Sequence, residues 1–420
     1  MTALWAADTA AQLLFNKVRA GVAENVQRFP RYTCVQTVTR TQYELPLAGS
    51  SCANVIAAHR RNPAARTLRW HDRLRLDVAV GEQSEMFSWA GASQFETGEV
   101  GQLVAHGATG SGEFGSFIAS IFGGDAEGFA YNGVSDTPLG KLAAFGFTVP
   151  LSKSHYKYSS AGNGYLTVAY HGSFYVEPES ADLRKLELEA VDFPSDDVCH
   201  VSDTIEYDRA QIGQNSFMLP KDSSMDVIYR NFTESLNETS FAGCREYVGQ
   251  STISFDTEEN GKTLEAEKKA ALKPLPPKTH LRVRINPPVD SATAAAGDPI
   301  TGVVDAQVKD KGEIVARVGD KLHGRILRLE QTVGATPRWT VAILFETFER
   351  NGFEQKVALR PLDDGDRSPL TQGRAGRVFI SPNGANPLTA QRPAGGGIYS
   401  FIEPGNLMLG QKFESEWEIR

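Results

Sequence analysis

The chain lacks the sequence patterns that mark many enzymes and metalloproteins. Its 420 residues contain no H-E-x-x-H motif, no G-x-S-x-G elbow and no phosphate-binding loop with a Lys-Ser or Lys-Thr ending. Its 8 histidines show no tight metal-ligand spacing. We therefore expect a non-enzymatic protein with no catalytic residues, no metal ligands and no cofactor.

Long runs of one residue class are missing as well. No apolar run reaches the ~18 residues of a membrane-spanning helix, so we expect no transmembrane segment. Acidic and basic residues are mixed along the chain, with a net charge of −8, so we do not expect nucleic acid as a partner. The start, Met1 to Ala7, lacks the basic and long apolar regions of a secretory signal. Its small residues are typical of the tail of a signal that has been removed.

Cysteine is scarce, and its positions indicate the compartment. Cys34, Cys52, Cys199 and Cys244 form no C-x-x-C pair, which argues against a zinc ribbon or a thioredoxin motif. Their even number and their grouping into two local pairs predict the disulfides Cys34–Cys52 and Cys199–Cys244. Disulfides need an oxidising compartment, so we expect a periplasmic or secreted protein. The alternative is four buried thiols in a cytosolic protein.

The hydrophobic pattern begins as a helix and then changes to strands. Apolar residues at helical spacing predict a helix over residues 9–29, which Pro30 ends. From Tyr32 the period becomes two, with strands predicted at 32–39, 69–80 and 85–89. The glycine-flanked segment, residues 107–124, interrupts this pattern, and its apolar spacing over 114–122 predicts a short helix.

Many strands follow with no helices between them. We predict them at 128–133, 141–149, 154–160, 164–171, 173–178, 183–191, 201–208, 215–220, 225–231 and 244–255. This series favours one curved antiparallel sheet, a half-barrel, over a doubly wound fold. The predicted class is therefore mainly β (α+β), with an N-terminal and an inserted helix.

A second β domain is predicted after a linker. Residues 257–278 are charged and then proline-rich, which is typical of a stiff linker. Residues 279–420 contain further alternating strands and a Gly/Pro-rich stretch at 363–395 that predicts a long loop. We thus expect a first domain over 1–256 and a small β-barrel over 279–420.

Aromatic and aliphatic side chains gather in two parts of the first domain and are our candidate ligand contacts. A curved sheet closed by an apolar helix makes a pocket for a lipid-like ligand. The alternative is an ordinary filled core. The candidates are Trp70, Phe87, Trp89, Phe95, Phe114, Phe117, Ile121 and Phe122.

The order of these elements resembles that of LolA/LppX-type periplasmic lipoprotein carriers over about residues 9–256. The stretches Arg28 to Thr37 and Tyr170 to Val176 are also similar to uncharacterised secreted proteins of Acidobacteria. The first resemblance implies an open half-barrel that holds acyl chains. The second implies an exported protein and identifies no functional residue.

Residues 279–360 resemble the small β-barrel of TrbI-type proteins of type IV secretion channels. The resemblance lies in Gly297-Asp298-Pro299, in Leu322-His323-Gly324-Arg325-Ile326 and in the strand from Val341 to Phe348. This chain has no apolar helix before that region, so we expect a packing or docking module and not a channel.

Together these features predict a cell-envelope or exported binding protein. Its first domain would hold a lipid or another apolar ligand, and its second would dock to an envelope protein. Residues 273–360 carry 14 Lys or Arg against 10 Asp or Glu, which fits a weakly basic docking surface. The alternative is a structural or assembly protein that acts through protein contacts alone.

Overall fold

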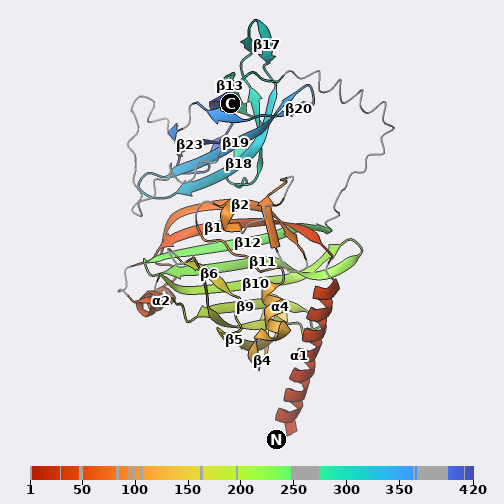
Figure 1. Cartoon of the computed structure of the whole chain (residues 1–420). Coiled ribbons are helices and arrows are strands. Elements are labelled where there is room, and N and C mark those ends of the chain that lie inside the picture. The colour runs from red at the N-terminus through yellow and green to blue at the C-terminus, as the bar shows by residue number, and fades with distance from the viewer. Residues whose placement is uncertain are drawn as a thin grey trace, which may run out of the picture. The chain divides into compact units, whose positions relative to one another are not determined.

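The computed structural model divides the chain into two compact units (Figure 1). Unit 1 comprises Met1–Arg69, Leu76–Ser88 and Ala92–Val248, and unit 2 comprises Trp70–Arg75, Trp89–Gly91 and Gly249–Arg420. The structure describes residues 2–28, 30–46, 51–81, 85–92, 95, 100–104, 107–160, 164–194, 197–246, 274–362, 365–366, 396–410 and 412–420.

Unit 1 is built on one large sheet, whose strands are stacked one beside the next in Figure 1. The strands follow the order β3-β2-β1-β12-β11-β10-β9-β8-β5-β4. Their bounds are β1 Tyr32–Glu44, β2 Thr67–Val80, β3 Glu85–Trp89, β4 Glu127–Thr137, β5 Gly140–Val149, β8 Ala169–Val176, β9 Leu183–Val191, β10 Val198–Ile212, β11 Asn215–Tyr229 and β12 Thr233–Glu246. A separate hairpin pairs β6 Lys157–Ser160 with β7 Gly164–Thr167.

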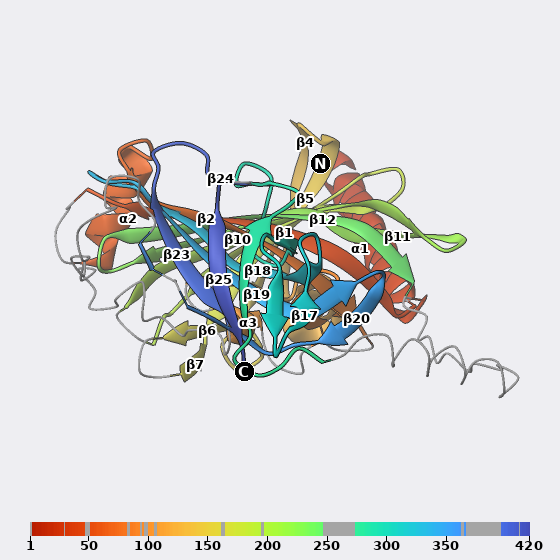
Figure 2. The same cartoon turned by 90° about the horizontal axis from the view of Figure 1, so that it is seen from above.

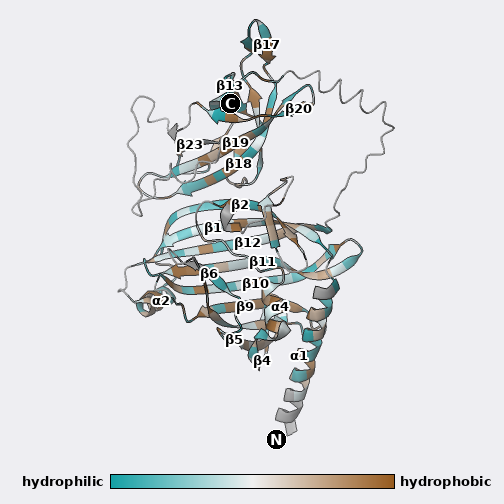
Figure 3. Cartoon of the chain, in the orientation of Figure 1, coloured by the Kyte–Doolittle hydropathy of each residue, from teal (hydrophilic) through white to brown (hydrophobic). Residues whose placement is uncertain are grey.

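Alternating hydropathy gives this sheet two different faces, as the changing colours along its strands in Figure 3 show. Adjacent residues of a strand point to opposite faces, and in β11 Val227 and Ile228 join different apolar clusters. The sequence-based strand boundaries were wrong in several places. The predicted strands 164–171 and 173–178 divide instead into β7 and β8. Most of the predicted strand 244–255 lies outside the described residues. The predicted strands 215–220 and 225–231 form the single strand β11, and most of β12 was missed, because its polar residues hide the alternation.

Helices cover both faces of the sheet in unit 1. The helix α1, Thr2–Arg28, confirms the predicted N-terminal helix and buries Val18 fully. The glycine-flanked segment forms α4, Ser116–Ser120, which continues into the π-helical turn η1, Ile121–Asp125. Two short helices were not predicted: α2, Cys52–Arg61, and α3, Val100–Leu103.

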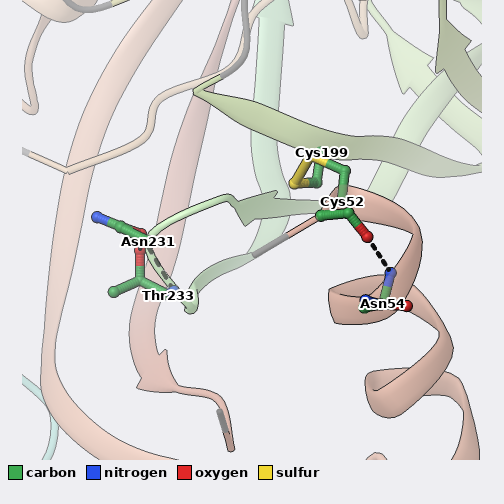
Figure 4. The surroundings of a disulfide bond; sticks show 6 residues. Cys52, Asn54, Cys199, Asn231 and Thr233 are labelled. Carbon is green, nitrogen blue, oxygen red and sulfur yellow. Dashed lines mark hydrogen bonds between the residues drawn. A yellow bond between two sulfur atoms is a disulfide. The ribbon is translucent and has the colours of Figure 1, made fainter. Parts of the chain in front are cut away.

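The cysteines form two disulfides, but the predicted pairing was wrong. Cys34 is bonded to Cys244, and Cys52 is bonded to Cys199. Cys34 and Cys244 are 210 residues apart in sequence, but the antiparallel pairing of β1 with β12 places them side by side. The second bond fastens the start of α2 to β10 (Figure 4). Sequence proximity failed as a guide because non-local strand pairing decides which thiols meet.

Unit 2 contains mainly antiparallel strands around its own core. They are β13 His280–Ile285, β14 Val289–Asp290, β15 Pro299–Val304, β16 Val308–Asp310, β17 Glu313–Ala316, β18 Lys321–Thr332, β19 Arg338–Arg350, β20 Phe353–Lys356, β21 Leu359–Pro361, β22 Gly365–Asp366, β23 Gly397–Ile402, β24 Met408–Leu409 and β25 Glu414–Ile419. The ladder runs from β20 through β19, β18, β15, β13 and β25 to β21. The strands therefore curl around a shared interior. Figure 2 gives a second view of their crossing directions.

The core of unit 2 starts before the predicted end of the linker. Leu275 is buried in the same cluster as Trp417 and Phe345, and Lys278 donates its backbone N–H to the carbonyl of Ile419. The proline-rich end of the predicted linker thus packs on unit 2. Residues 257–273 and nearly all of the predicted loop at 363–395 lie outside the described residues.

The predicted class, a mainly β protein with antiparallel sheets and few helices, is confirmed. No helix in the described part of the chain combines the length and the hydropathy needed to cross a lipid bilayer.

Candidate functional site

The eight candidate ligand contacts do not line one pocket. Trp70 and Trp89 belong to unit 2, whereas the other six belong to unit 1. Phe87 is buried and Phe95 is half-buried. The remaining four belong to the glycine-flanked segment. Phe114 packs in one place, and Phe117, Ile121 and Phe122 pack in another. The structure therefore places the glycine-flanked segment in the interior of unit 1 and assigns Trp70 and Trp89 to unit 2. The role of these residues in ligand binding stays a prediction.

Phe114 packs near β1 and β12, next to Tyr32 and Phe241. Its ring lies 6.0 Å from that of Tyr32 and 4.8 Å from that of Phe241, both in edge-on geometry. Such aromatic contacts contribute about 1 kcal/mol beyond their buried area. Phe114 is thus a fixed point of the core, and a ligand would have to displace it.

Phe117, Ile121 and Phe122 belong to a second cluster, which fills the space between α1, α4, η1 and the strands β5, β8 and β9. The Phe122 ring lies 5.1 Å from that of Phe174, and the Phe117 ring lies 5.4 Å from that of Tyr156. The helix α1 adds Leu14, Phe15 and Val18. We call this cluster the aromatic core of unit 1.

The aromatic core continues to the surface at the edge strand β4. Phe145 and Phe174 are buried and stacked with ring centroids 5.1 Å apart. Phe129 of β4 lies 6.3 Å from Phe174 and is 37% exposed, and Tyr131 lies 5.2 Å from Phe145 and is 42% exposed. A strip of aromatic rings therefore runs from the interior to solvent. Sequence reasoning missed Phe129 and Tyr131 because β4 has no clear alternation.

The carboxylate of Glu85 holds the glycine-flanked segment through hydrogen bonds to its backbone. Glu85, at the start of β3, accepts the backbone N–H groups of Gly112 at 2.9 Å and Phe114 at 3.1 Å. Burial raises the pKa of Glu85, and the two backbone hydrogen bonds oppose that rise. The segment also ties to the sheet through Ser120, whose hydroxyl lies 3.2 Å from that of Tyr170.

Glu113 lies near two other acids, Glu85 and Asp203. Burial, together with the charges of Glu85 and Asp203, raises the pKa of Glu113 to about 8. Burial also raises the pKa of Asp203 to about 6, while a hydrogen bond from Tyr156 lowers it. Converging acids with raised pKa values are also found in active sites. Here their partners are backbone groups, Tyr156 and Ser223, which is typical of a structural polar network.

The opposite face of the sheet carries an open polar groove of about 510 Å³. Side chains with hydroxyl and carboxylate groups line it, from β1, β10, β11 and β12: Thr37, Thr39, Thr204, Glu206, Asp222, Ser223, Ser224, Glu238, Thr239 and Ser240. The groove has no aromatic or aliphatic lining, so it does not suit an apolar ligand.

Comparison with known proteins gives little beyond a fold likeness. No family model matches the chain, and no curated protein matches it. One similar solved structure is a LolA superfamily protein, NE2245, from Nitrosomonas europaea, with 12% identity, 58% of this chain and 96% of that chain covered, and a TM-score of 0.25. Another is a putative outer membrane lipoprotein-sorting protein domain from Vibrio parahaemolyticus, with 9% identity, 58% and 97% covered, and a TM-score of 0.25.

The first match is named for the LolA superfamily and the second for lipoprotein sorting. At these identities and scores they carry no information on what this chain binds. The resemblance of residues 279–360 to TrbI-type barrels stays a prediction.

Proposed function

We propose that this chain is a non-catalytic binding protein of the cell envelope or exterior, whose unit 1 holds a lipid or another apolar ligand at its aromatic core. The observation that carries the proposal is the aromatic strip that leads from buried Phe174 to the exposed rings of Phe129 and Tyr131. The two disulfides support an oxidising compartment, periplasmic or extracellular.

Among the described residues the rings of the aromatic core pack against one another and against α1 and η1, so a ligand would enter by displacing part of the helical cover. The glycine-flanked segment is suited to such a movement, since Gly112 and Gly124 have positive φ and no atom would crowd a side chain at Gly115, Gly123 or Gly124. A ligand that covers the exposed parts of Phe129 and Tyr131 would gain roughly 3 kcal/mol, at about 25 cal/mol per Å².

The test is binding of a fluorescent fatty acid, cis-parinaric acid, to the full chain. We expect saturable binding in the micromolar range or tighter. Phe129→Ser and Tyr131→Ser should each weaken it by about tenfold, which corresponds to about 1.4 kcal/mol. Tyr165→Ser is the matched control, because Tyr165 is a 56% exposed aromatic residue of unit 1 that lies in the β6–β7 hairpin. Equal binding by all four proteins would refute the role of the strip.

A second candidate function follows from the position of β4. In the part of the sheet that the structure describes, β4 pairs with β5 alone, and Val134 is 52% exposed. An exposed edge strand with apolar side chains is a template for pairing with another chain. The chain would then be an assembly protein of the envelope. Absence of fatty-acid binding together with retention of an envelope protein by the wild type but not by Val134→Lys would favour this function.

A further inference from the structure

The helix α2 places one histidine, His59, over the face of the sheet that lies opposite the aromatic core. Cys52, Val55 and His59 are spaced three and four residues apart, so they lie on one side of the helix. Cys52 is bonded to Cys199 of β10, and Val55 is buried (Figure 4 shows the bond). His59 is therefore held over the sheet, and its side chain is 15% exposed.

Two carboxylates lie beneath His59. Asp226 of β11 pairs with Leu236, and Glu234 precedes Leu236 by two residues, so both acids occupy the same face as diagonal neighbours. One ligand atom from each of His59, Asp226 and Glu234 lies within 4.8 Å of the others. The Glu234 side chain is only 1% exposed, which makes it the most buried member of the group.

Some carboxylate oxygens of these two acids have a hydrogen-bond or ion-pair partner, and others have no hydrogen-bond donor among the described residues. Arg66 pairs with Oε1 of Glu234. Oε2 of Glu234 and Oδ1 of Asp226 are buried and have no hydrogen-bond donor among the described residues. The Oε2 atom lies 3.7 Å from Nδ1 of His59. Buried polar atoms without a donor are costly, on the order of 1–3 kcal/mol each, so a missing partner is indicated.

Charge points to what that partner is. Two carboxylates face one guanidinium, which leaves one negative charge uncompensated in a buried place. One imidazole nitrogen and two carboxylate oxygens are a ligand set that zinc-like cations accept, with a water in a fourth position. We propose that His59, Asp226 and Glu234 form a binding site for one divalent transition-metal cation of the zinc type, and that the cation fastens α2 to the sheet.

The second histidine–acid group provides an internal comparison. His323, Glu349 and Glu354 of unit 2 also come within 4.8 Å of one another. There Nε2 of His323 lies 2.6 Å from Oε2 of Glu349, and Lys321 lies 3.3 Å from Oε1 of the same carboxylate. The acid is thus already paired, and no buried atom of the three is left without a donor.

The experiment is calorimetric titration of chelator-stripped full chain with ZnCl2. We expect one equivalent to bind, with an affinity that Asp226→Asn and His59→Ala each weaken at least about tenfold, since each removes one ligand. His155→Ala, at an 80% exposed histidine, and His323→Ala should leave it unchanged. MgCl2 should not compete, because imidazole is a poor magnesium ligand.

A second readout keeps the test valid if a variant folds poorly. Zn²⁺ should slow amide hydrogen exchange over residues 52–61 of the wild-type chain, and no residues of unit 2 should be protected. The charge could also be balanced by a proton, either on His59 or on Asp226, whose pKa is raised by burial and by the charge of Glu234. Either protonated form predicts no saturable zinc binding. No saturable binding, binding unaffected by both ligand variants, binding lost in His323→Ala, or equal competition by MgCl2 would each overturn the proposal.

Discussion

At the residue scale, single glycines set how closely the strands of unit 1 approach. A side chain at Gly172 would place its Cβ 2.0 Å from the carbonyl oxygen of Glu187 on the neighbouring strand. Gly172→Ala should therefore lower the free energy of unfolding by about 1–3 kcal/mol, as overpacking does. Gly146→Ala is the control, since its nearest neighbour is the movable amide of Asn132 at 3.3 Å. Urea denaturation followed by circular dichroism measures both, and equal losses would contradict this reading.

Glu113 should make unit 1 less stable as the pH rises. Its pKa in the folded chain is about 8, above the ordinary value of 4.5, so the folded state keeps a proton that the unfolded state has lost. This proton's contribution to the free energy of unfolding is fully present below about pH 4.5. It declines as the pH rises towards 8, by on the order of a few kcal/mol. Glu113→Gln should flatten this slope in thermal unfolding between pH 5 and pH 9. An unchanged slope would show that the carboxyl is not protonated in the folded chain.

At the element scale, the disulfide Cys52–Cys199 controls α2. The helix has only 10 residues, too few to be stable alone, and Val55 is its one buried residue. The double variant Cys52→Ser/Cys199→Ser should raise hydrogen exchange over α2 by at least about tenfold. Cys34→Ser/Cys244→Ser, which removes the bond between β1 and β12, should leave α2 exchange unchanged. If both variants act equally on α2, the disulfide does not hold the helix locally.

The elements themselves were more predictable from the sequence than their contacts. The stripe of Leu14, Val18 and Val22 predicted α1, and the alternation over 183–191 predicted β9. By contrast, most of β12 was not predicted, because Glu238, Ser240 and other polar residues interrupt the alternation of apolar and polar residues that marks a strand. The predicted residues Phe117, Ile121 and Phe122 pack on the sheet. Phe129 and Tyr131 join them through the register of β4 with β5, which the sequence does not show. The disulfide pairing likewise depends on contacts between segments that are 210 and 147 residues apart in sequence.

At the scale of the whole molecule, the two units should respond differently to reductant. Both disulfides lie in unit 1, where each closes a long loop and stabilises by about 5 kcal/mol in the chain-entropy model. Four of the five tryptophans belong to unit 2: Trp339 and Trp417 lie in its core, and Trp70 and Trp89 lie in the parts of β2 and β3 that group with it. Dithiothreitol should therefore lower the thermal transition seen by far-ultraviolet circular dichroism more than the one seen by tryptophan fluorescence. Equal shifts by both probes would indicate one cooperative molecule.

The proposed binding function requires that the aromatic core of unit 1 can take up an apolar ligand. Its interior rings reach solvent at Phe129 and Tyr131, and the glycine-flanked segment covers it through backbone contacts with Glu85. The most direct test is native mass spectrometry of the full chain purified from an exported fraction, with organic extraction of anything bound. We predict a mass increase from a lipid that extraction releases and that Phe129→Ser reduces. A protein of bare chain mass, to which added fatty acid or phospholipid does not bind, would contradict it.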